Sequence, residues 1–177
     1  GTRLFATAYN NSVYSNTITT YGGSAHGISL DNLAFNNSVY SNVIFTNGSS
    51  ARGISLNTNV WNNSVFSNNI TTNGTTAHGI FLTTTVYSNI VYSNIVTING
   101  TGNGIYLFTT VYDNKVYSNI VTAYGDGQGI RLQTTAYNNS IYDNNITTTF
   151  TGGHGILLTG NTTNNSIYGN IIVVNKE

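Results

Sequence analysis

The sequence predicts an all-β solenoid of seven coils. This prediction rests on two features of the chain. A nine-residue motif, first present at 10–18 as NNSVYSNTI, comes back six more times, and a glycine motif, first complete at 27–30 as GISL, keeps the same period. The central aromatic residues of the first motif are separated by 26, 26, 26, 25, 25 and 26 residues. Self-similarity at such a period is typical of solenoids, in which each repeat forms one coil.

Each repeat contains three short runs in which apolar residues alternate with other residues. In the first full repeat these runs lie at 11–13, 16–18 and 28–30. Alternation with a period of two predicts short strands joined by corners. A helix would need apolar residues at a spacing of 3.6 over some ten residues, and the sequence has no such stretch. Length variation is confined to the segment between the 18-type position and the next glycine, which predicts a variable turn there.

Stacking one coil on the next would align like residues in columns that point inward. An asparagine side chain can bond to the same group about 4.8 Å above and below it, so two asparagine columns are predicted to be internal, structural ladders. They are Asn11, Asn37, Asn63, Asn89, Asn114, Asn139, Asn165 and Asn16, Asn42, Asn68, Asn94, Asn119, Asn144, Asn170. A leucine column beginning at Leu4 and a valine column beginning at Val13 are expected to form the core. The glycine column at 1, 27, 53, 79, 104, 129 and 155 is expected to mark a corner with positive φ or a close approach of backbones.

The spacing of asparagine, apolar residue, asparagine, apolar residue and then Gly-Ile-x-Leu resembles a known class of repeat. It is similar to the repeats of the NosD-like group and of the carbohydrate-binding and sugar-hydrolase β-helix group, over the whole chain. The resemblance implies a single-stranded right-handed parallel β-helix, and the unbroken period predicts one domain over 1–177 without evident caps. That group includes polysaccharide-active enzymes, periplasmic proteins linked to copper supply and surface proteins, so the fold alone does not select an activity.

The amino-acid composition argues against several classes of partner and of binding site. Only 6% of the residues are charged and the formal net charge is zero, so we expect no nucleic-acid partner. No apolar run approaches the roughly 18 residues of a membrane span, so we expect no membrane insertion. Cysteine is absent, which excludes disulfides and thiolate metal sites and leaves the redox compartment open.

Two aromatic stripes are predicted to lie outside the coil. They are Tyr9, Phe35, Trp61, Tyr87, Tyr112, Tyr137 and Tyr14, Tyr40, Phe66, Tyr92, Tyr117, Tyr142, Tyr168. Rings one strand spacing apart can stabilise the coil by packing on each other. Long exposed aromatic stripes also suit a ligand site or a lateral contact with sugar or protein. Both interpretations remain open from the sequence.

The titratable residues argue against an enzyme and against a cofactor. Polysaccharide lyases and hydrolases gather carboxylates on one face, whereas the acids here fall in different columns, and only Asp113 and Lys115 are neighbours in sequence. A polar column precedes the glycines and contains His26, Arg52, His78, Asn103, Gln128 and His154. His26 and His78 would lie two coils, or about 9.6 Å, apart, too far to share a metal. Methionine and cysteine, the soft ligands that suit copper(I), are absent, so we expect no cofactor, no metal site and no catalytic residue.

The two terminal coils of the predicted solenoid suggest a role in assembly. Neither end resembles a cap, and an open coil presents unpaired backbone groups that another strand can join. The sequence is either a segment of a longer array or a subunit whose open ends join head to tail. We favour the second explanation and expect an extracellular or cell-surface structural protein that joins copies of itself into a filament, sheath or coat. The expected assembly ends are Gly1, Arg3, Lys176 and Glu177. The alternative is a carbohydrate-binding module, or more weakly a polysaccharide-processing one, in which the aromatic stripes bind glycans or other cell-surface components. A threonine column beginning at Thr19 suggests an antifreeze surface, but Phe45 interrupts it.

Overall fold

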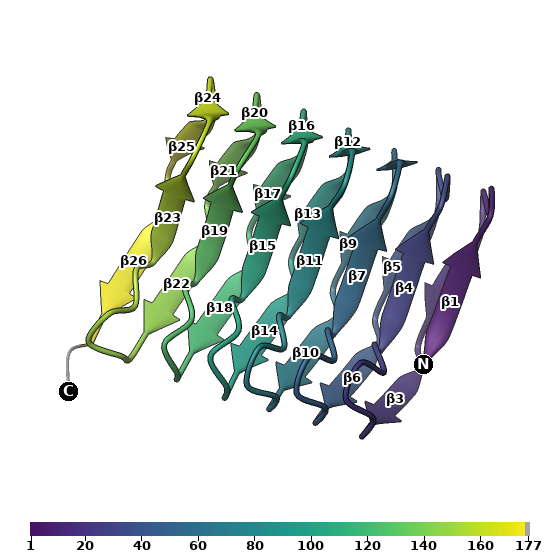
Figure 1. Cartoon of the computed structure of the whole chain (residues 1–177), viewed down its shortest axis with the longest axis horizontal. Helices are drawn as coiled ribbons and strands as arrows, with labels where there is room; N and C mark the ends of the chain where they lie inside the picture. The colour runs from purple at the N-terminus through teal and green to yellow at the C-terminus, as the bar shows by residue number, and fades with distance from the viewer. Residues whose placement is uncertain (176–177) are drawn as a thin grey trace.

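The structure, a computed structural model, describes residues 1–175 and consists of four parallel β-sheets wound around one axis (Figure 1). Lys176 and Glu177, two of the expected assembly-end residues, lie outside the described residues. Each coil passes through all four sheets, which we call A, B, C and D in chain order. The first and last coils lie at opposite ends of the stack (Figure 1). The prediction of an all-β parallel β-helix is confirmed.

Sheets A and D each contain seven strands of four residues. Sheet A consists of β1 (Thr2–Phe5), β4 (Ile28–Asp31), β7 (Ile54–Asn57), β11 (Ile80–Thr83), β15 (Ile105–Phe108), β19 (Ile130–Gln133) and β23 (Ile156–Thr159). Sheet D consists of β3 (Thr17–Thr20), β6 (Val43–Thr46), β10 (Asn69–Thr72), β14 (Ile95–Ile98), β18 (Ile120–Ala123), β22 (Asn145–Thr148) and β26 (Ile171–Val174).

Sheets B and C are built from shorter strands and carry the aromatic stripes. Sheet B consists of β8 (Val60–Trp61), β12 (Val86–Tyr87), β16 (Val111–Tyr112), β20 (Ala136–Tyr137) and β24 (Thr162–Thr163), and single bridges extend it to Phe35 and Tyr9. Sheet C consists of β2 (Ser12–Tyr14), β5 (Ser38–Tyr40), β9 (Ser64–Phe66), β13 (Ile90–Tyr92), β17 (Lys115–Tyr117), β21 (Ser140–Tyr142) and β25 (Ser166–Tyr168). The described residues contain no helix that could span a membrane.

Register places like residues over like residues from coil to coil. Leu30 pairs with Leu4 on one side and with Leu56 on the other. The same is true of Val91, between Val65 and Val116. The inward residues of all four sheets therefore merge into one apolar core that runs the length of the coil. A slip of one residue would turn every inward side chain outward, which is why this alternation fixes the register.

The two asparagine ladders lie inside the coil, as predicted. Asn63 is fully buried, and its backbone N–H and its Nδ2 both donate to Oδ1 of Asn89, over 2.9 and 3.0 Å. The same Nδ2 donates to the carbonyl oxygens of Ala34 and Trp61, over 3.1 and 2.9 Å. Each ladder amide thus satisfies backbone groups at a corner, where the strands leave them unpaired.

The glycine column marks a close approach of backbones and not a positive φ. A Cβ on Gly53 would collide with Cγ2 of Ile70 and lie 2.6 Å from the carbonyl oxygen of Gly79. Sheet A can therefore meet sheet D at this corner only without a side chain. Positive φ occurs instead at the corner of sheets A and B, as at Thr58 (64°) and Asn59 (55°), and at the residue before each ladder asparagine, such as Asn62 (54°) and Ser67 (54°). Asparagine and serine before the ladder asparagines fit the left-handed region better than branched residues do.

Candidate functional site

The aromatic stripes form two continuous stacks on the outside of sheets B and C. Ring centroids of neighbouring members are 4.8–5.9 Å apart, and their planes differ by 1–10°. Packing also raises the pKa of Tyr112, first through loss of solvation and then through the neighbouring phenols Tyr137 and Tyr87. The rings therefore pack on each other in the way that strand spacing allows.

This packing determines what the stacks can present to a partner. The interior rings are half-buried, whereas the end rings Tyr9, Tyr14 and Tyr168 are 57%, 54% and 54% exposed. Since each interior ring lies between two others, its faces are covered and only its edge and any hydroxyl reach the solvent. The stacks thus present rows of edges, which suit a lateral contact better than the stacking of a sugar on an open ring face.

The polar column before the glycines forms a third ladder. Nδ1 of His26 accepts the backbone N–H of Arg52 over 3.1 Å, and Nδ1 of His78 accepts that of Asn103 over 2.9 Å. Farther along, Oδ1 of Asn103 accepts the N–H of Gln128, and Oε1 of Gln128 accepts the N–H of His154, over 2.9 and 2.6 Å. The column therefore consists largely of side chains that offer an acceptor to the next coil.

The ladder fixes the protonation of two histidines. Because Nδ1 accepts a backbone N–H in both His26 and His78, the neutral ring carries its proton on Nε2. Burial, and then the nearby Arg52 guanidinium, lowers the pKa of His26, although the Asp31 carboxylate opposes this effect. Burial, followed by the charges of Arg52 and Arg131, lowers the pKa of His78 from 6.5 to about 4. Both rings are neutral acceptors at pH 7.

His78 should make the fold less stable at mildly acidic pH. The unfolded state takes up a proton below pH 6.5, whereas the folded state does so only near pH 4. The free energy of unfolding that neutral His78 contributes is therefore fully present above pH 6.5. It decreases as the pH falls toward 4, by about 3 kcal/mol in all. The variant His78→Asn keeps an acceptor, as Asn103 does one coil later, and should lose this decrease. Urea unfolding of both proteins at pH 7 and pH 4.5 tests the expectation, and an equal decrease in both would contradict it.

The outer face of sheet A carries a cluster that breaks the repeat. The guanidinium of Arg52 lies over the ring of Phe81, 4.0 Å from its centroid, and that of Arg131 lies 5.4 Å from the centroid of Tyr106. The rings of Phe81 and Tyr106 are 5.2 Å apart, and His78 contacts both. These outward aromatic residues are buried, at 5% and 8% exposure, because their neighbours cover them. We call Arg52, His78, Phe81, Tyr106 and Arg131 the arginine–aromatic cluster.

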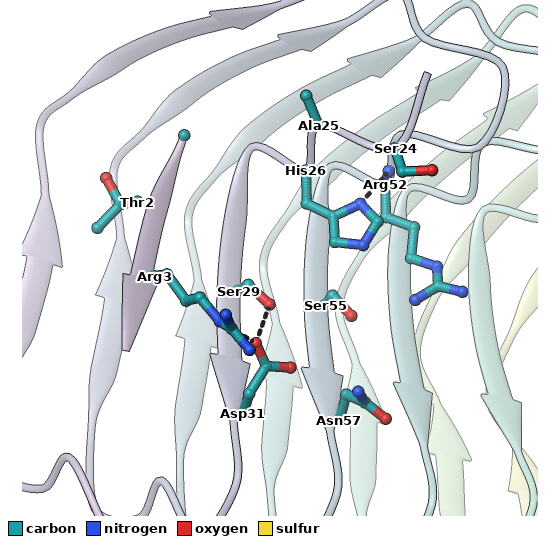
Figure 2. Close-up of a pocket in the computed structure, with 11 residues that line it drawn as sticks. Thr2, Arg3, Ser24, Ala25, His26, Ser29, Asp31, Arg52, Ser55 and Asn57 are labelled. Carbon is teal, nitrogen blue, oxygen red and sulfur yellow. Dashed lines mark hydrogen bonds and ion pairs between the residues drawn. The ribbon is translucent and has the colours of Figure 1, made fainter. Parts of the chain in front are cut away.

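A polar pocket of about 430 Å³ adjoins this cluster toward the first coil. The Arg3 guanidinium and the Ser29 hydroxyl both donate to Oδ2 of Asp31 over 2.8 Å. Figure 2 shows these three side chains together, with the Arg52 guanidinium turned away from them toward the neighbouring strands. Further polar groups come from His26, Ser55 and Asn57.

Several residues that no sequence motif connects lie next to one another in the structure. Arg3, an expected assembly-end residue, forms an ion pair with Asp31 of the second coil. The arginine–aromatic cluster was missed because Phe81, Tyr106 and Arg131 interrupt a column that begins with Arg3, Ser29 and Ser55. This departure from an otherwise uniform repeat was the available signal. The acids Asp113 and Asp143 lie elsewhere, at corners with positive φ.

Comparison with known proteins gives one family and one solved structure. Residues 79–177 match the family described as NosD, periplasmic copper-binding protein. No curated protein matches the chain. The fold is similar to the crystal structure of a double mutant of the periplasmic alginate epimerase AlgG, with a TM-score of 0.62 and 17% sequence identity. The match covers 96% of this chain and 48% of that chain, so this chain spans about half the length of that protein.

Proposed function

The chain belongs to the NosD family, and from this premise we propose that it is a structural β-helix protein of the periplasm or cell exterior. In this proposal its terminal coils stack head to tail on those of further copies. The names of the family and of the alginate epimerase support the location, since both are described as periplasmic. A filament, sheath or coat would result, because a head-to-tail contact that does not close continues in one direction.

The single observation that carries the proposal is the complementarity of the two ladder ends. Inside the coil, each ladder asparagine donates to Oδ1 of the asparagine in the following coil, as Asn139 does to Asn165 over 2.9 and 3.0 Å. Among the described residues, the backbone N–H groups of Asn165 and Asn170 in the last coil have no such acceptor. In the first coil, Oδ1 of Asn11 and Asn16 has no such donor among the described residues. The donors of one copy therefore match the acceptors of the next.

Apolar exposure at the last coil supports the same contact. Ile172 continues the inward column of Ile70 and Ile146, which are fully buried, yet it is itself 45% exposed. Val174 at the end of β26 is 40% exposed. A further coil would cover this apolar area, which stabilises an association roughly in proportion to the area removed from water.

The residues do not fit a copper site, although the family description names copper. The described residues contain no group of three or more histidine, cysteine, aspartate or glutamate side chains placed to hold a metal ion. His26 and His78 use the Nδ1 lone pair for a backbone N–H, so neither neutral ring has a free lone pair. The sequence supplies no cysteine or methionine to replace them. We therefore assign no copper chemistry to this chain.

The experiment compares two lysine variants in one strand of the last coil. Ile172→Lys places a charge on the open apolar end, whereas Ile171→Lys places the same charge on the outer face of sheet D, where Ile171 is 63% exposed. Sedimentation velocity and electron microscopy should show end-to-end assemblies of the unchanged protein and of Ile171→Lys, and monomers of Ile172→Lys. Dispersed monomers of all three at high concentration would overturn the proposal, and so would equal assembly of the two variants.

A further inference from the structure

The cationic and imidazole side chains of this neutral protein gather on one face. All three arginines and all three histidines of the sequence lie on or beside the outer face of sheet A: Arg3, Arg52, Arg131, His26, His78 and His154. The acids there are Asp31, on a strand of that sheet, and Asp126, in the turn two residues before Gln128. A net charge of zero for the whole chain therefore conceals one face with an excess of positive charge.

Two of the arginines, Arg52 and Arg131, form no ion pair with a described residue. Arg3 is neutralised by Asp31, which is the only ion pair among residues 1–175. The guanidinium groups of Arg52 and Arg131 donate no hydrogen bond to any described residue, and the buried Nε of Arg131 is left without an acceptor. Burial lowers the pKa of Arg52, with the Asp31 charge opposing it. A half-buried guanidinium without an acceptor is unfavourable until an anion pairs with it.

Each of these guanidinium groups is held in a fixed orientation. Phe81 supports Arg52 and Tyr106 supports Arg131, at the centroid distances given above. The hydroxyl of Tyr106 is itself fixed, because it donates to Oε1 of Gln133. A guanidinium that lies on a ring keeps its N–H edge free, and that edge matches the two oxygens of a carboxylate or sulfate.

The distance between the guanidinium groups of Arg52 and Arg131 determines which kind of anion can bind both. Arg52 and Arg131 lie three coils apart, which is about 14 Å along the axis at one strand spacing per coil. One small anion cannot reach both groups, whereas an extended chain that lies along the axis can. The polar pocket beside Arg52 offers Ser29, Ser55 and Asn57 as donors and acceptors and the carboxylate of Asp31 as an acceptor, a set that suits the hydroxyl groups of a sugar.

We propose that the outer face of sheet A binds an acidic polysaccharide chain that runs along the β-helix axis. Its carboxylate or sulfate groups pair with Arg52 and Arg131, and the hydroxyl groups of one sugar enter the polar pocket. The site lies on a different wall from the aromatic stacks and does not depend on end-to-end assembly. A nucleic acid fits less well, because its phosphates need a continuous basic stripe and only two guanidinium groups are unpaired here.

The test measures binding of a defined probe to the full chain by isothermal titration calorimetry. The probe is a hexamer of galacturonic acid, and the comparison ligands are its fully methyl-esterified form, a sulfated oligosaccharide and a hexamer of glutamate. The variants are Arg52→Gln and Arg131→Gln. Lys115→Gln is the matched control, because it removes the same charge from an exposed residue of sheet C. Circular dichroism confirms that each variant is folded, so that lost binding is not lost structure.

The proposal expects binding of the galacturonate hexamer, of the sulfated oligosaccharide or of both, and none of the ester. Each arginine variant should weaken that binding about tenfold or more, since a charge-assisted bidentate pair is removed. Lys115→Gln should leave it within about twofold, and raising the salt concentration should weaken it. Equal binding of the glutamate hexamer would overturn the assignment to a sugar. Absence of binding to both acidic saccharides, or equal losses in all three variants, would overturn the site itself.

Discussion

Gly53→Ala is expected to destabilise the protein by at least about 3 kcal/mol, because the new methyl group would overlap atoms that cannot move away. Its Cβ would collide with Cγ2 of Ile70 in sheet D and would lie 2.6 Å from the backbone oxygen of Gly79 in the next coil. A side chain can change its rotamer, but the carbonyl oxygen is part of the coil. Relief would therefore require the coils to separate at this corner, which breaks hydrogen bonds in sheet A.

Gly152→Ala is the matched control for this variant. Gly152 lies in the variable turn of the sixth coil, and a Cβ there would meet no heavy atom within 4 Å. Its replacement should change the free energy of unfolding by no more than about 0.5 kcal/mol. Chemical unfolding of both variants, followed by circular dichroism, measures the difference. If Gly53→Ala were as stable as Gly152→Ala, the coil spacing described here would be wrong at the corner of sheets A and D.

Asn63→Leu is expected to have the second large effect, a loss of about 3 kcal/mol or more. Leucine has a similar size but cannot accept from the backbone N–H and Nδ2 of Asn37, which now both reach Oδ1 of Asn63. It also cannot donate to the carbonyl oxygens of Ala34 and Trp61. Several buried polar groups would lose a partner together, and each costs about 1–3 kcal/mol when left unsatisfied.

Asn73→Leu gives the comparison for the ladder variant. Asn73 is an exposed turn residue whose Oδ1 accepts one bond from the side chain of Asn99. Its loss should cost no more than about 0.5 kcal/mol. Thermal and urea unfolding of the two variants should differ clearly. Equal stability of Asn63→Leu and Asn73→Leu would mean that the ladder amides contribute little beyond their volume.

The fold could be predicted from the sequence because the same residue pattern occurs in every repeat. The ladder asparagines, the leucine and valine columns and the close approach at the glycines follow from a fixed period combined with alternation of two. One inward column was missed: Thr46 and Thr72 are fully buried in sheet D, and each hydroxyl donates to a backbone oxygen five residues later. In a sequence, threonine at such a position is typical of a surface residue. Only the geometry of the following turn shows the backbone oxygen that accepts its hydrogen bond.

The candidate site could not be predicted in the same way. Arg52 and Arg131 belong to different columns and lie 79 residues apart in the sequence, so no local motif joins them. Their closeness to Phe81 and Tyr106 follows from side-chain packing on the outer face of sheet A, which periodicity does not determine. The overall charge of zero pointed away from an anion site. Only the arrangement of the coils shows that the arginines share a face.

Intermolecular disulfide formation tests most directly whether the coil of one copy continues into the next. The chain has no cysteine, and Ser12 and Ser166 occupy the first and last positions of one column in sheet C. In head-to-tail stacking, Ser166 of one copy and Ser12 of the next would have Cα atoms about 4.8 Å apart, a separation that a disulfide can bridge. An equal mixture of the single variants Ser12→Cys and Ser166→Cys should therefore form the mixed disulfide faster than either variant pairs with itself. Equal rates for the mixed and the self-paired products would contradict the stacking of one coil on the next.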